Sequence, residues 1–220
     1  MARRVSLVVT ALMLLVTVGP AHAGLVSVQL GTQNFTDGQL VPSATFNTAS
    51  AGEPAPFDQF YGADSLAGPD FSKSWTFNFA AGLTVLSASL TLGITDNDAA
   101  APGSQVNSFT LDATNNLTTA LDTAFEAPVQ AVSNQYKVYT IVIPPAALGA
   151  FGDGSATFSL TLQNAVNVLN QTVHNGAGLD FSRLDLTTVD NQVATPEPST
   201  WLLLVSGLGG LAGYRRRRRK

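Results

Sequence analysis

The chain contains no cysteine among its 220 residues. It therefore forms no disulfide bond and offers no thiolate as a nucleophile or metal ligand. Small exported domains often depend on disulfides for stability. Without them, the burial of apolar side chains must stabilise the fold, and the roughly 170 residues between the two ends of the chain suffice for one such core.

Basic side chains are scarce in the central part of the chain. Residues 24–195 hold three of them, Lys73, Lys137 and Arg183, against 14 acidic side chains, which gives a formal net charge of −11. A surface this acidic repels polyanions, so nucleic acid and anionic lipid surfaces are excluded as partners. It is compatible with calcium, with other cations and with simple hydration.

The residues and motifs typical of hydrolases are also few. His174 is the one histidine after residue 23, and the Asn175-Gly176 pair beside it predicts a solvated turn. We find no Gly-x-Ser-x-Gly motif, no pair of metal-binding histidines and no phosphate-binding glycine loop, so we expect a protein that is not an enzyme. Because a glycosidase needs only two carboxylates, a secreted carbohydrate-active enzyme of the glycosidase type is the alternative.

Aromatic side chains that could stack on sugars are limited too. Trp75 lies in the alternating segment Phe71–Phe79 and shares a face with Lys73 and three phenylalanines. This pattern predicts that Trp75 packs in the core. A sugar-stacking surface is the alternative interpretation.

The C-terminus combines three features in a fixed order. Pro196-Glu197-Pro198 precedes the apolar run Trp201–Tyr214, and the basic cluster Arg215–Lys220 follows it. As a helix the run is roughly 21 Å long, against roughly 30 Å of hydrocarbon in a bilayer, so it can cross only where the bilayer thins and the arginines snorkel. Because basic flanks stay cytoplasmic, we expect the C-terminus on the cytoplasmic side of the inner membrane and the rest of the chain on the opposite side.

The N-terminus carries the features of an export signal. A short basic segment, Met1–Arg4, is followed by the apolar segment Val5–Val18 and by the small-x-small site Ala21-His22-Ala23. This order predicts a signal peptide for the Sec machinery over residues 1–23, cleaved after Ala23. An uncleaved N-terminal anchor is the alternative.

The C-terminal features resemble the PEP-CTERM sorting tail of bacterial exported proteins over residues 195–220. The resemblance implies that an exosortase recognises Pro196-Glu197-Pro198 while the tail pauses in the inner membrane. Cleavage near this motif would release the protein to the cell envelope or to an exopolysaccharide matrix. Leu90–Asp98 and Asn175–Phe181 resemble, more weakly, segments of exported PEP-CTERM proteins of sandwich fold, and imply no activity.

Residues 24–194 read as one all-β domain. Period-two alternation is clearest in Leu86–Ile94 and Ala156–Leu162, and turn-rich segments with Gly, Pro, Asn and Asp separate the strand candidates. About eight such strands predict an antiparallel β-sandwich or jelly roll, flanked by an N-terminal signal helix and a C-terminal hydrophobic helix. A short helix is expected over Leu117–Phe125 and one helical turn over Ala146–Phe151. The other strand candidates are Leu25–Leu30, Ala44–Asn47, Phe71–Phe79, Val106–Leu111, Tyr136–Ile143 and Phe181–Val189.

Asp96-Asn97-Asp98 follows the alternating strand Leu86–Ile94 directly. Closely spaced carboxylate and amide oxygens are the ligands that calcium prefers, so Asp96 and Asp98 are candidate metal ligands. Asp and Asn also stabilise turns through their own backbone, and both interpretations stay open. If Val106–Leu111 pairs beside Leu86–Ile94, Asp112 lies at the far end of that hairpin, which leaves Asp70 and Asp180 as the next candidates.

The sequence thus predicts an exported, non-enzymatic β-sandwich protein of the cell surface or exopolysaccharide matrix. Its expected partners are the Sec machinery, an exosortase, the inner membrane before processing and, as ligands, calcium or polysaccharide.

Overall fold

The computed structural model describes residues 23–97, 104–126, 133–166, 169–189 and 207–208. Contacts divide the chain into one compact unit, Ala23–Val189, and a second that combines Met1–His22 with Asp190–Lys220. Residues 1–22 of the predicted signal peptide, Asp98 and the Pro-Glu-Pro motif lie outside the described residues, whereas Ala23, the last residue of that predicted peptide, is the first residue of a strand. Within the described residues, no helix has both the length and the apolar character needed to cross a bilayer.

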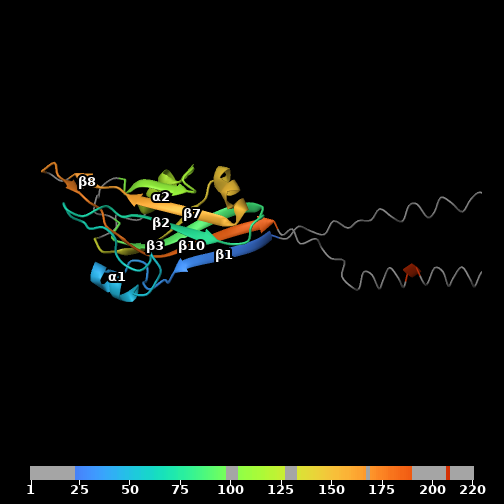
Figure 1. Ribbon diagram of the computed structural model, residues 1–220, viewed down its shortest axis with the longest axis horizontal. Helices are drawn as coiled ribbons and strands as arrows, with labels where there is room; N and C mark the ends of the chain where they lie inside the picture. The colour runs from blue at the N-terminus through green and yellow to red at the C-terminus, as the bar shows by residue number, and fades with distance from the viewer. Residues whose placement is uncertain (1–22, 98–103, 127–132, 167–168, 190–206, 209–220) are drawn as a thin grey trace, which may run out of the picture. The chain divides into compact units, whose positions relative to one another are not determined.

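Two antiparallel sheets of four strands form Ala23–Val189 (Figure 1). The first sheet has the order β1-β10-β3-β6, and the second has the order β2-β7-β4-β5. This confirms the predicted all-β class and the antiparallel two-sheet architecture. The strands of the first sheet are β1 (Ala23–Gly31), β10 (Gly178–Val189), β3 (Val85–Thr95) and β6 (Tyr136–Val142), and those of the second are β2 (Ser72–Asn78), β7 (Ser155–Leu162), β4 (Val106–Leu111) and β5 (Asn115–Asn116).

Short elements complete the unit. The strands β8 (Ala165–Val166) and β9 (Thr172–Val173) form a small hairpin sheet, and three helical segments lie between the long strands. The predicted helix over Leu117–Phe125 is α2 (Thr118–Glu126), and the predicted turn after the prolines is the 3₁₀ helix η2 (Pro145–Asp153). The predicted strand Ala44–Asn47 is wrong: these residues belong to helix α1 (Ser43–Ala49). The segment is too short for its pattern to separate strand from helix.

Alternating side chains explain how the two sheets share one core. In β7 every second residue is buried, and in β2 the buried residues are Trp75 and Phe77. Trp75 stacks on Phe109 and Phe158, with ring centroids 6.3 and 6.2 Å away. Its indole Nε1 donates a hydrogen bond to Ser182 Oγ of the first sheet at 3.0 Å, so the prediction that Trp75 is a core residue is confirmed.

A second apolar cluster lies against the opposite face of the first sheet. It joins Phe35, Val41 and Phe46 to Tyr136 and Phe181. The long segment between β1 and β2, which includes α1, covers this part of the sheet. Near the end of β3 both faces are therefore covered, and consecutive residues from Leu90 to Thr95 are all buried.

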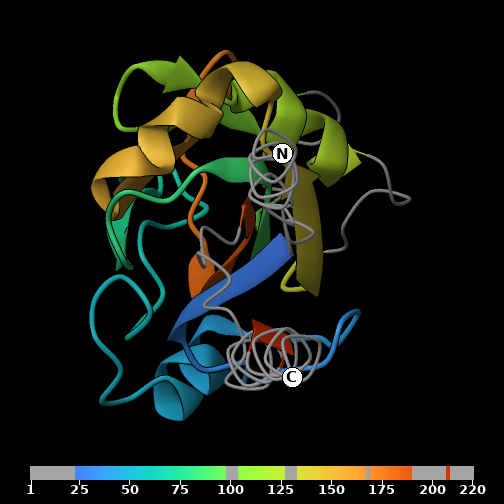
Figure 2. The ribbon, with the colours of Figure 1, turned by 90° about the vertical axis from the view of Figure 1, so that its right-hand side faces the viewer.

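The strand directions give the unit two different ends. At one end β1 begins and β10 finishes, with Ala23 paired to Val189. At the other end β10 begins while β1 and β3 finish, close to the start of β6. We call this second end the loop end, and it contains segments 32–71, 96–97, 104–105, 133–135, 163–166 and 169–177. Figure 1 shows these connections gathered away from the point where β1 begins, and Figure 2 looks at the unit from the end where β1 begins.

The partner of β4 differs from the expected one. We considered a hairpin between Val106–Leu111 and Leu86–Ile94, but β4 pairs with β7 and β5 in the second sheet, whereas β3 pairs with β10 and β6 in the first. The chain therefore passes from one sheet to the other between β3 and β4, and the hairpin considered above does not form.

Candidate functional site

The loop end contains a shallow pocket of about 360 Å³. Its walls come from four segments that are far apart in sequence: the start of α1, the segment after Asp58, the residue after β3 and the turn before β6. Five polar residues and one aromatic residue line it, together with two small residues. They are Ser43, Asp64, Asp96, Ser133 and Asn134, then Phe60, and then Gly62 and Ala63.

Asp96 connects two sides of this pocket. It is 6% exposed and has a left-handed backbone, with φ at 60°, which Asp and Asn tolerate better than most residues. Its Oδ1 accepts a hydrogen bond from the Asn134 backbone N–H at 2.6 Å and one from Ser133 Oγ at 3.5 Å. Asp96 therefore holds the turn before β6 in place, which agrees with the turn interpretation and leaves the calcium prediction untested.

Asp64 has the same role on the other side of the pocket. Its Oδ1 accepts a hydrogen bond from the Gly176 backbone N–H at 2.8 Å. Tyr61 and Ala177 nearby form an isolated antiparallel bridge, with two N–H···O distances of 2.9 Å. The pocket wall is thus bonded to the segment that enters β10.

Phe60 supplies the aromatic surface of the pocket. Its backbone N–H donates to Asn47 Oδ1 at 2.6 Å, and its half-buried ring packs against the second apolar cluster. A Cβ at position 176 would lie 2.7 Å from this ring, so only glycine lets the ring approach the backbone there.

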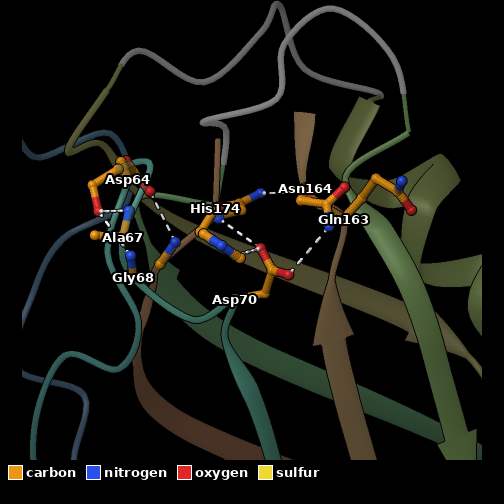
Figure 3. A network of polar contacts seen from close by, with 10 residues as sticks. Asp64, Ala67, Gly68, Asp70, Gln163, Asn164 and His174 are labelled. Carbon is orange, nitrogen blue, oxygen red and sulfur yellow. Dashed lines mark hydrogen bonds and ion pairs between the residues drawn. The ribbon is translucent and has the colours of Figure 1, made fainter. Parts of the chain in front are cut away.

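Asp70 organises a polar network beside the pocket (Figure 3). Its Oδ1 accepts a hydrogen bond from the Asn175 backbone N–H at 2.9 Å, and its Oδ2 accepts one from Asn164 Nδ2 at 3.4 Å. His174 Nδ1 lies 3.3 Å from Asp70 Oδ1, without the alignment of a hydrogen bond. His174 is therefore a half-buried neighbour of a carboxylate rather than the solvated turn residue that we expected.

Ser65 fixes the loop that carries Asp64. Its Oγ accepts hydrogen bonds from the backbone N–H groups of Ala67 and Gly68, at 3.3 and 3.0 Å, and its carbonyl oxygen accepts one from the His174 backbone N–H at 2.9 Å (Figure 3). These bonds order an otherwise irregular loop against the segment before β10.

Asp180 lies at the same end of the first sheet but inside the fold. It has no exposed surface, and its two oxygens accept hydrogen bonds from the backbone N–H and the Nδ2 of Asn34, both at 2.9 Å. Burial raises the pKa of Asp180, and the bonds from Asn34 oppose that rise. Burial also raises the pKa of Tyr136, with the negative charge of Asp180 as the next cause.

The structure separates the predicted metal candidates. Asp96 lines the pocket, Asp98 lies outside the described residues, and Asp180 binds Asn34. Asp112 follows β4 near the end opposite the loops, where its Oδ1 accepts a hydrogen bond from the Thr157 backbone N–H at 2.8 Å. Among the described residues, no three His, Asp or Glu side chains form a group able to hold a metal ion.

Phe60 and Asp64 were not predicted as site residues. Both lie in an aperiodic segment, and they reach the pocket through bonds to residues 13 and 112 positions away. The turn-forming residues around Asp64 mark a loop in the sequence, but nothing there indicates which other loop it meets.

The protein-family model of the PEP-CTERM protein-sorting motif matches residues 194–220. No curated protein sequence matches the chain. Among solved structures, the chain is similar to a family GH115 4-O-methyl-alpha-glucuronidase, BtGH115A, with specificity for decorated arabinogalactans. That similarity has a TM-score of 0.34 at 11% identity, and it covers 71% of this chain but only 17% of that enzyme. A likeness this weak carries no argument about fold or activity.

Proposed function

Because the chain carries the PEP-CTERM sorting motif of exported, exosortase-processed proteins, we propose that it is a non-enzymatic protein of the cell surface or extracellular matrix that binds neutral polysaccharide at its loop end. The sorting motif is the observation that carries the exported, envelope-associated part of this proposal. The pocket lined by Phe60, Asp64 and Asp96 supports the part about the ligand.

The proposed route has two processing steps. The Sec machinery exports the chain through residues 1–23, and signal peptidase cleaves after Ala23. An exosortase then acts at Pro196-Glu197-Pro198 while the following apolar run is in the inner membrane. The order of basic, apolar and small residues at the N-terminus supports the first step, and the matched motif at residues 194–220 supports the second.

The composition of the pocket favours a sugar ligand. Sugar hydroxyls donate to carboxylate, amide and hydroxyl oxygens, which Asp64, Asp96, Asn134 and the two serines supply, and Phe60 offers an apolar ring. The volume of about 360 Å³ is near the lower limit for small-ligand sites, roughly 300–1,000 Å³, which suits one or two sugar units of a longer chain. Two carboxylates in the wall disfavour an anionic sugar, so the proposed ligand is neutral.

The sheet connectivity supports a finer description of the fold. Eight strands in two antiparallel four-stranded sheets, ordered β1-β10-β3-β6 and β2-β7-β4-β5, are what a jelly roll requires, and lectin domains are among the proteins built in this way. We propose a jelly roll on this basis, while the ligand is argued from the pocket alone because a fold does not define a function.

Binding to soluble polysaccharides tests the proposed ligand. The exported protein should bind at least one neutral polymer among dextran, galactan and mannan, and should not bind anionic alginate. Phe60→Ala should weaken binding at least about 10-fold (about 1.4 kcal/mol), whereas Leu66→Ala should not change it, because Leu66 is an exposed apolar residue of the same loop outside the pocket wall. Equal binding by both variants would contradict the proposal.

The pocket also gives a specific reason to keep the glycosidase alternative. Asp64 and Asp96 are two carboxylates in one pocket beside an aromatic ring, which is the minimum that glycoside hydrolysis needs. We favour binding because each carboxylate already accepts a backbone N–H and holds a loop. Release of reducing sugar that disappears in both Asp64→Asn and Asp96→Asn would establish the enzyme instead.

A further inference from the structure

Asn175-Gly176 is the one Asn-Gly pair of the chain. In such a pair the backbone nitrogen of the glycine can attack the side-chain carbonyl carbon of the asparagine, because glycine has no Cβ to hinder the approach. The new N–Cγ bond closes a succinimide ring, and the Cγ–Nδ2 bond breaks to release ammonia, which carries away the proton of the attacking nitrogen. Water then opens the ring to aspartate or isoaspartate, so the reaction needs no enzyme or cofactor.

Packing requires the glycine of this reactive pair. A Cβ at residue 176 would lie 2.7 Å from the Ala63 backbone nitrogen and 2.7 Å from the Phe60 ring. Both distances are too short for a real contact, so a larger residue at position 176 would displace the pocket wall. The chain therefore keeps a reactive dipeptide at a position where a less reactive one does not fit.

The folded protein opposes each step of this reaction. The Gly176 N–H, whose nitrogen would attack, donates to Asp64 Oδ1 at 2.8 Å. The Asn175 Nδ2, which would leave as ammonia, donates to the backbone oxygens of Asn97 and Gln163 at 3.4 and 3.2 Å. Asn175 is also 0% exposed, which keeps out the water that opens the ring.

The protection comes from one neighbouring segment, residues 64–70. Three consecutive backbone N–H groups donate to it: that of His174 to the Ser65 carbonyl oxygen at 2.9 Å, that of Asn175 to Asp70 Oδ1 at 2.9 Å, and that of Gly176 to Asp64 Oδ1 (Figure 3). Segment 64–70 is irregular and lies on the surface, and such loops open locally at a lower free energy than the core strands. Access to the reactive pair therefore depends on this segment staying in place.

We propose that Asn175-Gly176 is a latent deamidation site, which segment 64–70 keeps unreacted while the loop end is closed and which reacts when that segment detaches. The modification is one-way. Aspartate at position 175 would place a carboxylate against the carbonyl oxygens of Asn97 and Gln163, which repel it, and isoaspartate would lengthen the backbone before Gly176. Either product opposes reclosure, so a reacted molecule loses the wall of the pocket permanently.

Deamidation rates at individual asparagines test the site. They are measured on the exported protein by peptide mapping with mass spectrometry after incubation in mildly alkaline buffer. Asn175 should react at least about 10-fold more slowly in the folded wild type than in wild type unfolded in urea, because reaction in the folded protein requires local opening. Asp64→Ala should raise the rate at Asn175 of the folded protein at least about 10-fold, because it removes a hydrogen bond to a charged acceptor.

Two controls separate local detachment from general effects. Asp153 is exposed, and its Oδ1 also accepts a backbone N–H, from Ser155 at 3.0 Å, but at the start of β7. Asp153→Ala should therefore keep the wild-type rate at Asn175. Asn107, an exposed residue of β4 that serine follows, reports global unfolding in the same sample, and its rate should not change in Asp64→Ala.

Asn175→Asp tests whether the modification is one-way. This variant carries one of the two reaction products from the start. Its thermal midpoint at neutral pH should lie at least about 2 °C below that of the wild type, because it buries a carboxylate against two carbonyl oxygens. A midpoint equal to that of the wild type would mean that the product is accommodated, and would contradict the one-way step.

Three results on the rates would overturn the proposal. One is a rate at Asn175 that is equal in folded and unfolded wild type, because the fold would then give no protection. Another is an equal rate at Asn175 in Asp64→Ala and Asp153→Ala. The third is an equal acceleration at Asn107 and Asn175 in Asp64→Ala, which would assign the reaction to global unfolding rather than to segment 64–70. None of these measurements depends on polysaccharide binding.

Discussion

Asp180 keeps a carboxylate inside the fold, held by the backbone and side chain of Asn34. The bonds join the start of the long segment after β1 to strand β10. Burial raises the pKa of this carboxyl, so the folded protein favours the neutral form more than the unfolded chain does. Asp180 therefore makes the stability of the fold dependent on pH.

The contribution of Asp180 to the free energy of unfolding should decrease as the pH rises. An unfolded aspartate has a pKa of about 3.9, and the folded value is higher. The contribution of Asp180 to stability is thus fully present below about pH 4, is lost as pH rises through the folded pKa, and is constant above it. We expect the unfolding free energy of the wild type minus that of Asp180→Asn to fall across this window in urea titrations.

A matched variant controls for the general effect of one negative charge. Asp153 is exposed, so Asp153→Asn should not reproduce the decrease. A difference between wild type and Asp180→Asn that is constant, or that rises with pH, would contradict the assignment even if the variant is less stable throughout.

A hydrogen bond in the buried core joins the two sheets directly. The Trp75 indole of β2 donates to Ser182 Oγ of β10 in the buried core, whereas most other contacts between the sheets are apolar. Apolar contacts tolerate small displacements of one sheet over the other, but a hydrogen bond of 3.0 Å does not. This bond therefore fixes the register between the sheets.

Removing the acceptor should be costly. Ser182→Ala leaves a buried indole N–H without a partner, so we expect a loss of about 1–3 kcal/mol in unfolding free energy. In a Trp75→Phe background the same change should cost less, because no donor is left unpaired, and a double-mutant cycle in urea measures the difference. Ser74→Ala on the exposed face of β2 is the control, expected within about 0.5 kcal/mol of the wild type; additive effects of Ser182→Ala and Trp75→Phe would contradict the role assigned to the bond.

The strands could be predicted from the sequence where one face of the strand is buried and the other is exposed to solvent. In β7 and β2 the alternation of Phe, Ala or Trp with Ser and Thr identified both the strands and the inward faces. The prediction failed for α1, whose Phe46 is its one buried residue, since a single apolar contact sets no period. The alternation also does not reveal that Thr91, on the face opposite Leu90 and Leu92, is only 6% exposed, with its Oγ1 2.9 Å from Thr140 Oγ1 of β6.

The candidate site was less predictable than the strands. Asp96 was found because it follows a strongly patterned strand. Phe60 and Asp64 were missed because loop positions are set by long-range bonds such as the one between Asp64 and Gly176, and these leave no period in the sequence.

At the scale of the whole molecule, the first and last residues of the folded unit are neighbours on adjacent strands. Ala23 pairs with Val189 at the end opposite the loops, so the predicted signal peptide precedes, and the sorting tail follows, one pair of neighbouring residues. The loop end, with its pocket, is therefore the part of the unit most distant along the strands from the point where the tail begins.

Processing is tested by the mass of the exported protein. The form recovered from the extracellular fraction should begin at Gly24 and lack Arg215–Lys220. Replacing Pro196 and Pro198 with alanine should leave the protein in the inner membrane, while Ser199→Ala with Thr200→Ala in the same linker should not. Extracellular protein that still carries the arginine cluster would disprove the sorting hypothesis.

The pairing of the first strand with the last also decides when folding can finish. During export the N-terminal strand crosses the membrane first, but its hydrogen-bonding partner, β10, crosses last, just ahead of residues 190–220. Until then β1 lacks its partner strand, and we expect the predicted cleavage site after Ala23 to remain accessible to signal peptidase. The first sheet closes in one late step, when translocation is almost complete. A chain that is interrupted before Gly178 cannot close this sheet and should be degraded in the periplasm rather than accumulate.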